Sequence, residues 1–205
     1  MKLYSYIKIA YRKLFRISAN EADKFQLLKE NMNIKIGANC KIENLNIHTY
    51  KTKKGYLNIE IGDDCYLMGN ITLHSENSRI KIGNRVFIGP DTTFFCYDSI
   101  EIHDDVMFSW GCTVIDTNAH SLKSEERLTD VIDWKKGPEF KNWSVVLSSP
   151  VVVEAKSWVG FNSIITKGVT LGEGTVVACG SVVTKSTEPY SIVGGNPAVL
   201  IKKTS

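Results

Sequence analysis

Residues 153–183 decide the fold, and they read VEAKSWVGFNSIITKGVTLGEGTVVACGSVV. A large aliphatic residue recurs there every six positions: Val153, Val159, Ile165, Leu171, Val177 and Val183. Four positions after each of the first five stands a small or β-branched residue: Ser157, Ser163, Val169, Thr175 and Ser181. Neither the helical period of about 3.6 nor the strand period of about 2 produces this spacing. A triangular coil with one such repeat on each flat side does, because it places both residues inside a prism.

The same pattern continues upstream with interruptions. Shorter pieces of it occupy residues 36–42, 61–73, 82–94 and 102–114. More polar stretches, where we expect loops or bulges, separate these pieces: 45–60, 74–81 and 95–101. One coil cannot bury its own inner face, so stability must come from stacking many coils. The sequence therefore predicts a mainly β protein with a parallel β-helix over residues 31–188.

Two segments depart from the repeat. Residues 116–150 are polar and lie between two regular pieces, so we expect a long arm that leaves the coils and carries part of an active site. Residues 1–30 carry apolar and basic side chains at helical spacing, which predicts an amphipathic helix. Residues 1–20 of such a helix can contact an anionic membrane surface. Packing against the prism or a neighbouring subunit is the alternative, and we favour it.

Composition excludes several classes of protein. The 205 residues carry a net charge of +3 without a dense basic cluster, so we expect no nucleic-acid partner. The five cysteines include no CxxC pair, which argues against a disulfide framework or a zinc site and favours reduced thiols in the cytoplasm. Cys40, Cys65 and Cys112 stand at the inward position of the repeat, where we expect small buried side chains. Cys96 and Cys179 lie off that position.

The most specific motifs lie in the last third of the chain. They are VEAKSWVGFNS at 153–163, KGVTLG at 167–172, GSVVTK at 180–185 and PYSIVGGNPA at 189–198. In this order they resemble the hexapeptide-repeat acyltransferases, and the resemblance covers roughly residues 60–203. More narrowly, the chain resembles the branch with maltose, galactoside and nodulation-factor acetyltransferases and the O-acetyltransferases of surface polysaccharides.

This resemblance implies a left-handed β-helix, a homotrimer with active sites in the clefts between subunits, and acetyl-coenzyme A bound along the C-terminal coils. Residues 189–205 would form a cofactor-binding tail. The positions that match the cofactor site of the family are Trp158, Gly160, Ala178, Cys179, Gly180, Thr184, Lys185 and Lys202.

The chemistry of acetyl transfer needs a base that removes a proton from the attacking hydroxyl. A neutral imidazole suits this task at cellular pH. Among the four histidines, only His120 stands at the junction between repeat and arm, where the catalytic histidine of the family lies. We place His48 and His74 in loops and His103 at an outward corner. Because they are scattered along the sequence, we expect no metal site.

A base also needs a group that orients its ring. Asp116 and Asn118 are the nearby polar candidates, a backbone carbonyl is an equal alternative, and Asp116 can instead open the arm as an Asx turn. Asp91, Tyr97 and Trp143 are candidates for contacts with the acceptor. Trp143 can equally pack the arm onto the prism.

The sequence therefore predicts a transferase that moves an acetyl group from acetyl-coenzyme A to a hydroxyl of a saccharide, such as a glycan or surface-polysaccharide precursor, by direct attack. The alternatives are N-acetylation of an amino sugar or antibiotic, and a β-helix scaffold without catalysis. We expect the protein in the cytoplasm, including the inner face of the membrane.

Overall fold

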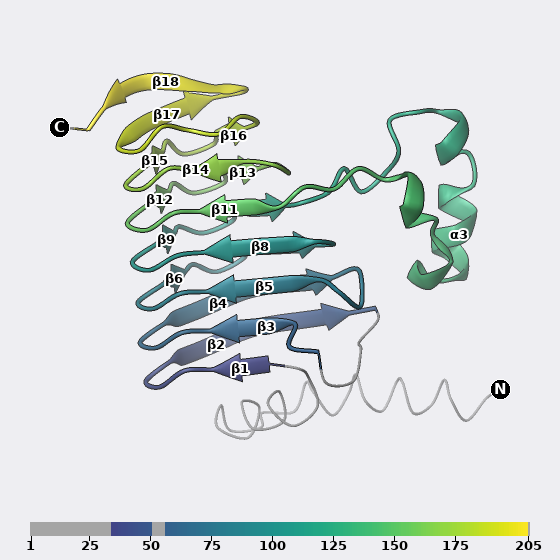
Figure 1. Ribbon diagram of the computed structural model, residues 1–205, viewed down its shortest axis with the longest axis horizontal. Coiled ribbons are helices and arrows are strands. Elements are labelled where there is room, and N and C mark those ends of the chain that lie inside the picture. Colours follow the sequence, from purple (N-terminus) through teal and green to yellow (C-terminus); the bar gives the residue numbers. More distant parts are fainter. Residues whose placement is uncertain (1–33, 51–55, 205) are drawn as a thin grey trace. The chain divides into compact units, whose positions relative to one another are not determined.

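The computed structural model describes residues 34–50 and 56–204, so the predicted N-terminal helix lies outside the described residues. Parallel strands stack as successive coils with three flat faces (Figure 1). The first face consists of β1 (Ile34–Ile36), β3 (Ile59–Ile61), β5 (Arg79–Ile82), β8 (Ser99–Ile102), β11 (Val151–Val153) and β14 (Thr170–Leu171). The second consists of the starts of β2 (Lys41–Thr49) and β4 (Tyr66–Leu73), β6 (Phe87–Ile88), β9 (Met107–Phe108), β12 (Trp158–Val159), β15 (Val176–Val177) and β17 (Ser191–Gly195).

The third face bears the arm. It consists of the ends of β2 and β4, β7 (Thr93–Cys96), β10 (Thr113–Ile115), β13 (Ile164–Ile165) and β16 (Val182–Val183). The predicted parallel β-helix is thus confirmed. The expected loops were partly wrong: β2 extends to Thr49, so His48 lies in a strand, and β5 and β8 begin inside the expected loops 74–81 and 95–101.

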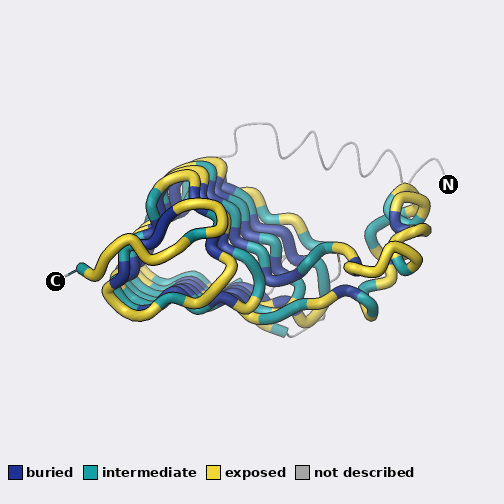
Figure 2. The backbone as a smooth tube through the Cα atoms, turned by 90° about the horizontal axis from the view of Figure 1, so that it is seen from above, coloured by how far each residue is buried: buried dark blue, intermediate teal, exposed yellow. Residues whose placement is uncertain are grey.

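The inside of the prism is the hydrophobic core, seen in Figure 2 as buried segments repeated from coil to coil. All six aliphatics from Val153 to Val183 are at most 2% exposed, as the spacing predicts. The small residues from Ser157 to Ser181 are at most 1% exposed. Each buried aliphatic contributes about 1.5–3 kcal/mol, so the stacked rows dominate the stability of the prism.

Two inward rows contain larger or softer side chains. The rings of Phe94 and Phe108 meet edge-on with centroids 5.5 Å apart inside the prism. Cys65 and Cys112 are buried as predicted, and Cys40 is half-buried. Cys96, which the repeat did not place inside, is also buried.

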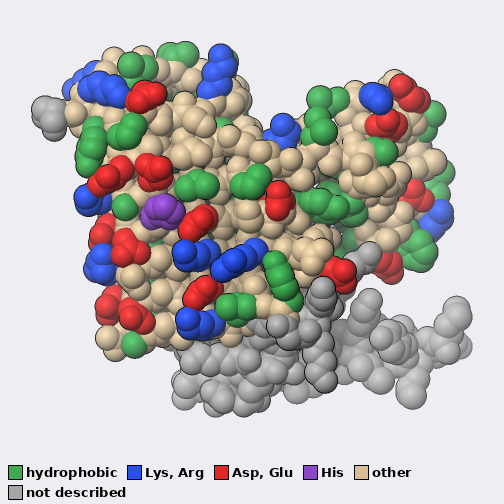
Figure 3. All heavy atoms as spheres, viewed as in Figure 1, with side chains coloured by type: hydrophobic (Ala, Val, Ile, Leu, Met, Phe, Trp, Pro, Cys, Tyr) green, Lys and Arg blue, Asp and Glu red, His purple; other side chains and the backbone are tan. Residues whose placement is uncertain are grey.

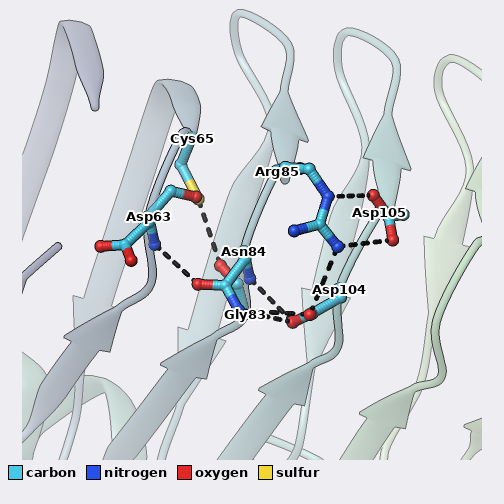
Figure 4. Close-up of polar contacts among 7 residues, drawn as sticks. All are labelled: Asp63, Cys65, Gly83, Asn84, Arg85, Asp104 and Asp105. Carbon is cyan, nitrogen blue, oxygen red and sulfur yellow. Dashed lines mark hydrogen bonds and ion pairs between the residues drawn. The ribbon is translucent and has the colours of Figure 1, made fainter. Parts of the chain in front are cut away.

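The corners between the first and second faces are held by a ladder of polar side chains (Figure 4). Asn84 Oδ1 accepts the N–H of Asp63 at 2.8 Å, and Asp104 Oδ1 accepts the N–H of Asn84 at 2.8 Å. One residue at each of these corners has a positive φ: Asn39, Asp64, Arg85, Asp105, Lys156 and Gly174. The ladder satisfies backbone donors that the turn leaves without a strand partner.

The outer surface of the first face is charged (Figure 3). The register pairs Lys35 with Glu60 and Lys81 with Glu101, and the ion pairs measure 2.8 and 3.0 Å. Such exposed pairs contribute about 0–1 kcal/mol each. This face of the lower coils is therefore an ordinary solvated surface.

Strand β4 turns from the second face to the third at Gly69. The φ of Gly69 is +97°, and a Cβ there would lie 2.2 Å from the carbonyl oxygen of Thr92 in the next coil. Only glycine fits this bend, because it tolerates both the conformation and the close approach.

The arm leaves the third face after β10 and returns at β11, and it projects from the side of the stack (Figure 1). Thr117 and Ser148 form an antiparallel bridge at its base. Its helices are η1 (Glu125–Arg127), α3 (Asp130–Lys136), η2 (Pro138–Phe140) and η3 (Trp143–Val145). No helix of the described residues is long and apolar enough to span a bilayer.

The last coil ends in a hairpin. Strand β18 (Ala198–Lys203) turns back and pairs antiparallel with β17, so the final strand of the second face runs against all the others.

Candidate active site

A tight turn at the base of the arm presents His120. The N–H of His120 donates to the carbonyl of Asn118 at 2.6 Å, and Ala119 between them has a φ of +59°. The N–H of Asn118 donates in turn to Leu147 O at 2.9 Å, across the base of the arm. Three-residue turns with a positive central φ are rare and strained, and such strain is concentrated at functional sites. Asn118 thus acts through its backbone, holding the turn that presents His120.

The imidazole of His120 belongs to a three-residue cluster. Nδ1 of His120 contacts Oδ2 of Asp130, the first residue of α3. Lys141 Nζ donates to the same Oδ2 at 2.7 Å and lies 3.3 Å from His120 Nδ1. The side chain of His120 is 48% exposed, whereas those of Asp130 and Lys141 are 9% and 0% exposed. The arm therefore buries the charged pair behind a ring that faces solvent.

Electrostatics keep Asp130 ionised. Burial raises the pKa of its carboxyl, but the hydrogen bonds from His120 and Lys141 outweigh burial and lower the pKa overall. An ionised carboxylate only accepts hydrogen bonds, so it holds the ring proton on Nδ1. The lone pair then lies on Nε2, the atom that a general base uses.

Asp116, one of the candidates to orient the ring of His120, does not contact that ring in this structure. Its carboxylate is 0% exposed and accepts the backbone N–H groups of Tyr97 and Asp98, both at 2.8 Å. It therefore ties the start of the arm to the preceding coil. The carboxylate on His120 belongs to Asp130, ten residues further along the chain.

Aromatic side chains pack the arm against the third face. The ring of Trp143 stacks on Tyr97 at 4.7 Å and lies 5.0 Å from His74. Three further rings contact His74: Tyr50, Phe95 and Trp134. Burial, and to a lesser extent the charge of Lys141, lower the pKa of His74 to about 4, so it stays neutral at physiological pH. Tyr97 and Trp143, two candidates for acceptor contacts, thus lie side by side next to Lys141.

The candidate cofactor residues of the second face gather at its corner with the third. A Cβ on Gly160 would lie 2.8 Å from the backbone N of Cys179, so the two coils touch there and require glycine. The ring of Trp158 is 47% exposed and donates to Ser109 Oγ at 3.1 Å. Gly180 opens onto free space, because a Cβ there would meet nothing within 4 Å.

Two backbone donors of this corner are already used within the prism. The N–H of Ala178 donates to Val193 O and that of Gly180 to Phe161 O, at 2.8 and 2.9 Å. Those two N–H groups are therefore not free for a ligand. The exposed side chains and the open space beside Gly180 are what this corner offers.

The other candidates lie elsewhere. Thr184 and Lys185 follow β16 and are exposed at the corner from which the arm leaves, two coils further along. Lys202 is exposed on β18. Asp91 is exposed before β7, at the corner that also holds Gly180 and not at the arm. The structure therefore places Asp91 and Tyr97 at opposite ends of the third face.

Sequence reasoning missed Asp130, Lys141 and an aromatic pair. Trp110 and Phe161 stack with centroids 4.8 Å apart and an interplanar angle of 1°, and both are exposed at the corner of Gly180. Each of the two residues stands two positions after a repeat residue, Phe108 or Val159, so aligning the coils could have predicted that they stack. No repeat or motif marks Asp130 and Lys141, because the arm has no period.

Comparison with known proteins agrees with this architecture. The family model of the hexapeptide repeat of succinyl-transferase matches residues 150–185. A chloramphenicol acetyltransferase from Agrobacterium fabrum is 43% identical over 68 residues, 32% of each chain. A galactoside O-acetyltransferase from Lactococcus lactis is 24% identical over 195 residues, which cover 95% of this chain and 75% of that enzyme. This chain spans 32%, 44% and 53% of the length of three of its curated relatives.

Among solved structures, a mutant of AntD, an N-acyltransferase from Bacillus cereus in complex with dTDP and coenzyme A, has a similar fold. Its TM-score is 0.65 at 22% identity, and the match covers 92% of this chain and 91% of that one. Repeat and coil geometry define a left-handed parallel β-helix protein. Residues 150–185 carry the hexapeptide repeat, and the described fold is that of the solved hexapeptide-repeat acetyltransferases.

Proposed function

We propose that this protein transfers an acetyl group from acetyl-coenzyme A to a hydroxyl of a saccharide, with His120 as general base. The observation that carries the proposal is the pairing of His120 Nδ1 with the buried carboxylate of Asp130, while 48% of the His120 side chain remains exposed. An oriented imidazole with a free Nε2 is what proton removal from an acceptor hydroxyl requires.

In this mechanism Nε2 of His120 takes the hydroxyl proton while the acceptor oxygen forms a bond to the acetyl carbonyl carbon. Asp130 stabilises the imidazolium that forms, because its carboxylate already contacts Nδ1. The carbon–sulfur bond of the thioester then breaks, and His120 returns the proton to the sulfur. Acetyl-coenzyme A supplies the activated acyl group, and the chain forms no covalent intermediate.

The residues at the corner of Gly180 fit a long, flexible acyl donor. The Trp110–Phe161 stack and Trp158 offer exposed aromatic surface beside the open space at Gly180. Lys202 is exposed on β18, and Lys185 is exposed at the arm end of the third face; Lys202, and Lys185 of a neighbouring copy, would meet phosphate groups. These are the residues that would hold the donor.

A homotrimer is part of the proposal. His120 and Gly180 lie beyond opposite ends of the third face, so one copy does not bring the base and the donor corner together. Apolar side chains are also exposed at or near the corner of Gly180, including Met107 at 49% and Trp110 at 54%. A neighbouring copy that packs on this corner would cover them and place its own arm beside the donor.

N-acetylation of an amino sugar is the second candidate. It is favoured by the likeness to AntD, an N-acyltransferase with structures in complex with dTDP and with dTDP-4-amino-4,6-dideoxyglucose. The same base serves an amine, so only acceptors separate the two reactions. A scaffold without catalysis is the third candidate, and it predicts no donor binding.

Calorimetry with acetyl-coenzyme A and coenzyme A tests the donor half without knowledge of the acceptor. We expect saturable binding by the wild type, weaker binding by Lys185→Ala and unchanged binding by Lys81→Ala, a lysine of the first face. A panel of hydroxyl and amine sugars then tests transfer. His120→Gln should lower kcat by about 10²–10⁴-fold, and His103→Gln should not. No binding by the folded wild type would contradict the proposal.

A further inference from the structure

We infer that Lys141 is a positioning residue that offsets the charge of Asp130 beside the base His120, acting through the carboxylate oxygen that both side chains contact. The inference rests on the proposed function, in which His120 is the base. It gives His120 a second partner, the cation Lys141, beside the anion Asp130. It concerns a side chain that touches neither substrate nor reacting atom.

The burial of Lys141 requires a reason. Its side chain is 0% exposed, although lysine is almost never fully buried unless it is paired. The ammonium contacts Asp130 Oδ2 at 2.7 Å, lies 3.3 Å from His120 Nδ1, and sits 5.5 Å from the centre of the Trp143 ring. A hydrophobic side chain would fill the same space without desolvating a charge. The position therefore points to a need for positive charge at the base.

The charges explain that need. A lone carboxylate beside an imidazole favours the imidazolium, which has no lone pair and cannot act as a base. With Lys141 present, the buried pair of Asp130 and Lys141 is neutral overall. Protonation of His120 would then place two cations on a single carboxylate oxygen. The ammonium thus offsets the effect of Asp130 on ionisation while leaving Asp130 free to orient the ring.

The other ionisable groups around the cluster do not provide this charge. His74, directly after β4, is neutral near physiological pH because burial lowers its pKa to about 4. Asp133 on α3 pairs with Lys136 at 3.1 Å. Beside the His120 backbone, Glu126 contacts Ser121 Oγ and Lys123, and Arg127 donates to Ser121 O at 2.6 Å. Lys141 is the cation that lies within 4 Å of Asp130 among the described residues.

The test is a pH titration of the histidine ring resonances by NMR, which needs neither donor nor acceptor. His120→Gln assigns the resonance, and His103 on the first face is the internal reference. Lys141→Met removes the charge with little change in length, and Lys141→Arg keeps it. We expect the His120 midpoint to move upward by about one pH unit or more in Lys141→Met and by only a few tenths in Lys141→Arg, with His103 unmoved.

An unchanged His120 midpoint in folded Lys141→Met protein would overturn the inference. If that variant does not fold, Lys141→Gln answers the same question with a polar side chain. Once an acceptor is known, Lys141→Met should lose about tenfold in rate on the acid side and recover at higher pH. An equal loss at every pH would mean a merely structural role. If the wild type transfers acetyl to no acceptor, the proposed function fails. The titration still shows whether the charge of Lys141 changes the protonation midpoint of His120.

Discussion

Replacing Asp116 with asparagine tests whether this carboxylate is structural. The side chain is fully buried and accepts two backbone N–H groups, those of Tyr97 and Asp98. Burial raises the pKa of Asp116 from 3.8 to about 6, although both hydrogen bonds oppose the rise. An asparagine keeps one acceptor oxygen and cannot titrate. The variant therefore removes the ionisation of this site with little change in shape.

The sign follows from the raised pKa. Between pH 6 and 3.8 the folded protein binds a proton at Asp116 that the unfolded chain does not, so the free energy of unfolding rises as the pH falls through this window. From pH 7.5 to 4.5 the gain amounts to about 2 kcal/mol. Asp116→Asn lacks this gain. Its stability relative to wild type should therefore be about 2 kcal/mol less favourable at pH 4.5 than at pH 7.5.

Urea unfolding at both pH values, at one fixed protein concentration, measures this difference. Glu139→Gln, an exposed carboxyl on the arm, is the matched control and should track the wild type. Curves of Asp116→Asn and wild type that stay parallel between the two pH values would refute the reasoning. Donor affinity at pH 7.5 should be unchanged, because Asp116 contacts the arm base and not the donor corner.

Other perturbations test the packing of the coils. Phe108→Ala should lower the free energy of unfolding by about 3–5 kcal/mol, measured by urea unfolding, and a loss below 1 kcal/mol would contradict its place in the core. Gly69→Ala should be more destabilising than Gly180→Ala in thermal unfolding, because both have positive φ but only the first meets a carbonyl oxygen, at 2.2 Å; equal losses would mean that the close approach does not matter. Cys179 is exposed and should react with a thiol reagent in the folded protein, whereas Cys65, whose pKa burial raises to about 11, should react only after unfolding. Equal rates for the two thiols would argue against this burial pattern.

The sequence was sufficient for the prism because its information is periodic. A six-residue spacing such as Val153 to Val159 determines which side chains point inward, and register follows from stacking equal coils. Less of the structure could be predicted where the coils are irregular. The polar composition of 45–60 indicated a loop, although β2 extends to Thr49. There the backbone pairs with β4 while several side chains face solvent, so composition alone indicated a loop.

The candidate site was only partly predictable. The position of His120 could be derived from the junction between repeat and arm, but its partner could not, since Asp130 and Lys141 come from different turns of an aperiodic segment. Asp116 was the nearer carboxylate in sequence, yet the chain direction at the base of the arm turns it toward Tyr97. Side-chain direction in such a segment depends on tertiary contacts, which adjacency in sequence does not determine.

The closing hairpin has a consequence for how copies of this chain can associate. A stack of parallel coils exposes, at its end, strand edges that can template a further chain and lead to fibres. Strand β18 occupies that edge on the second face and runs antiparallel to β17, so the parallel register of the stack does not continue beyond β17 there. The two lysines that end β18, Lys202 and Lys203, add repulsion between like ends. The hairpin thus makes this end of the second face a poor template for stacking a further parallel coil.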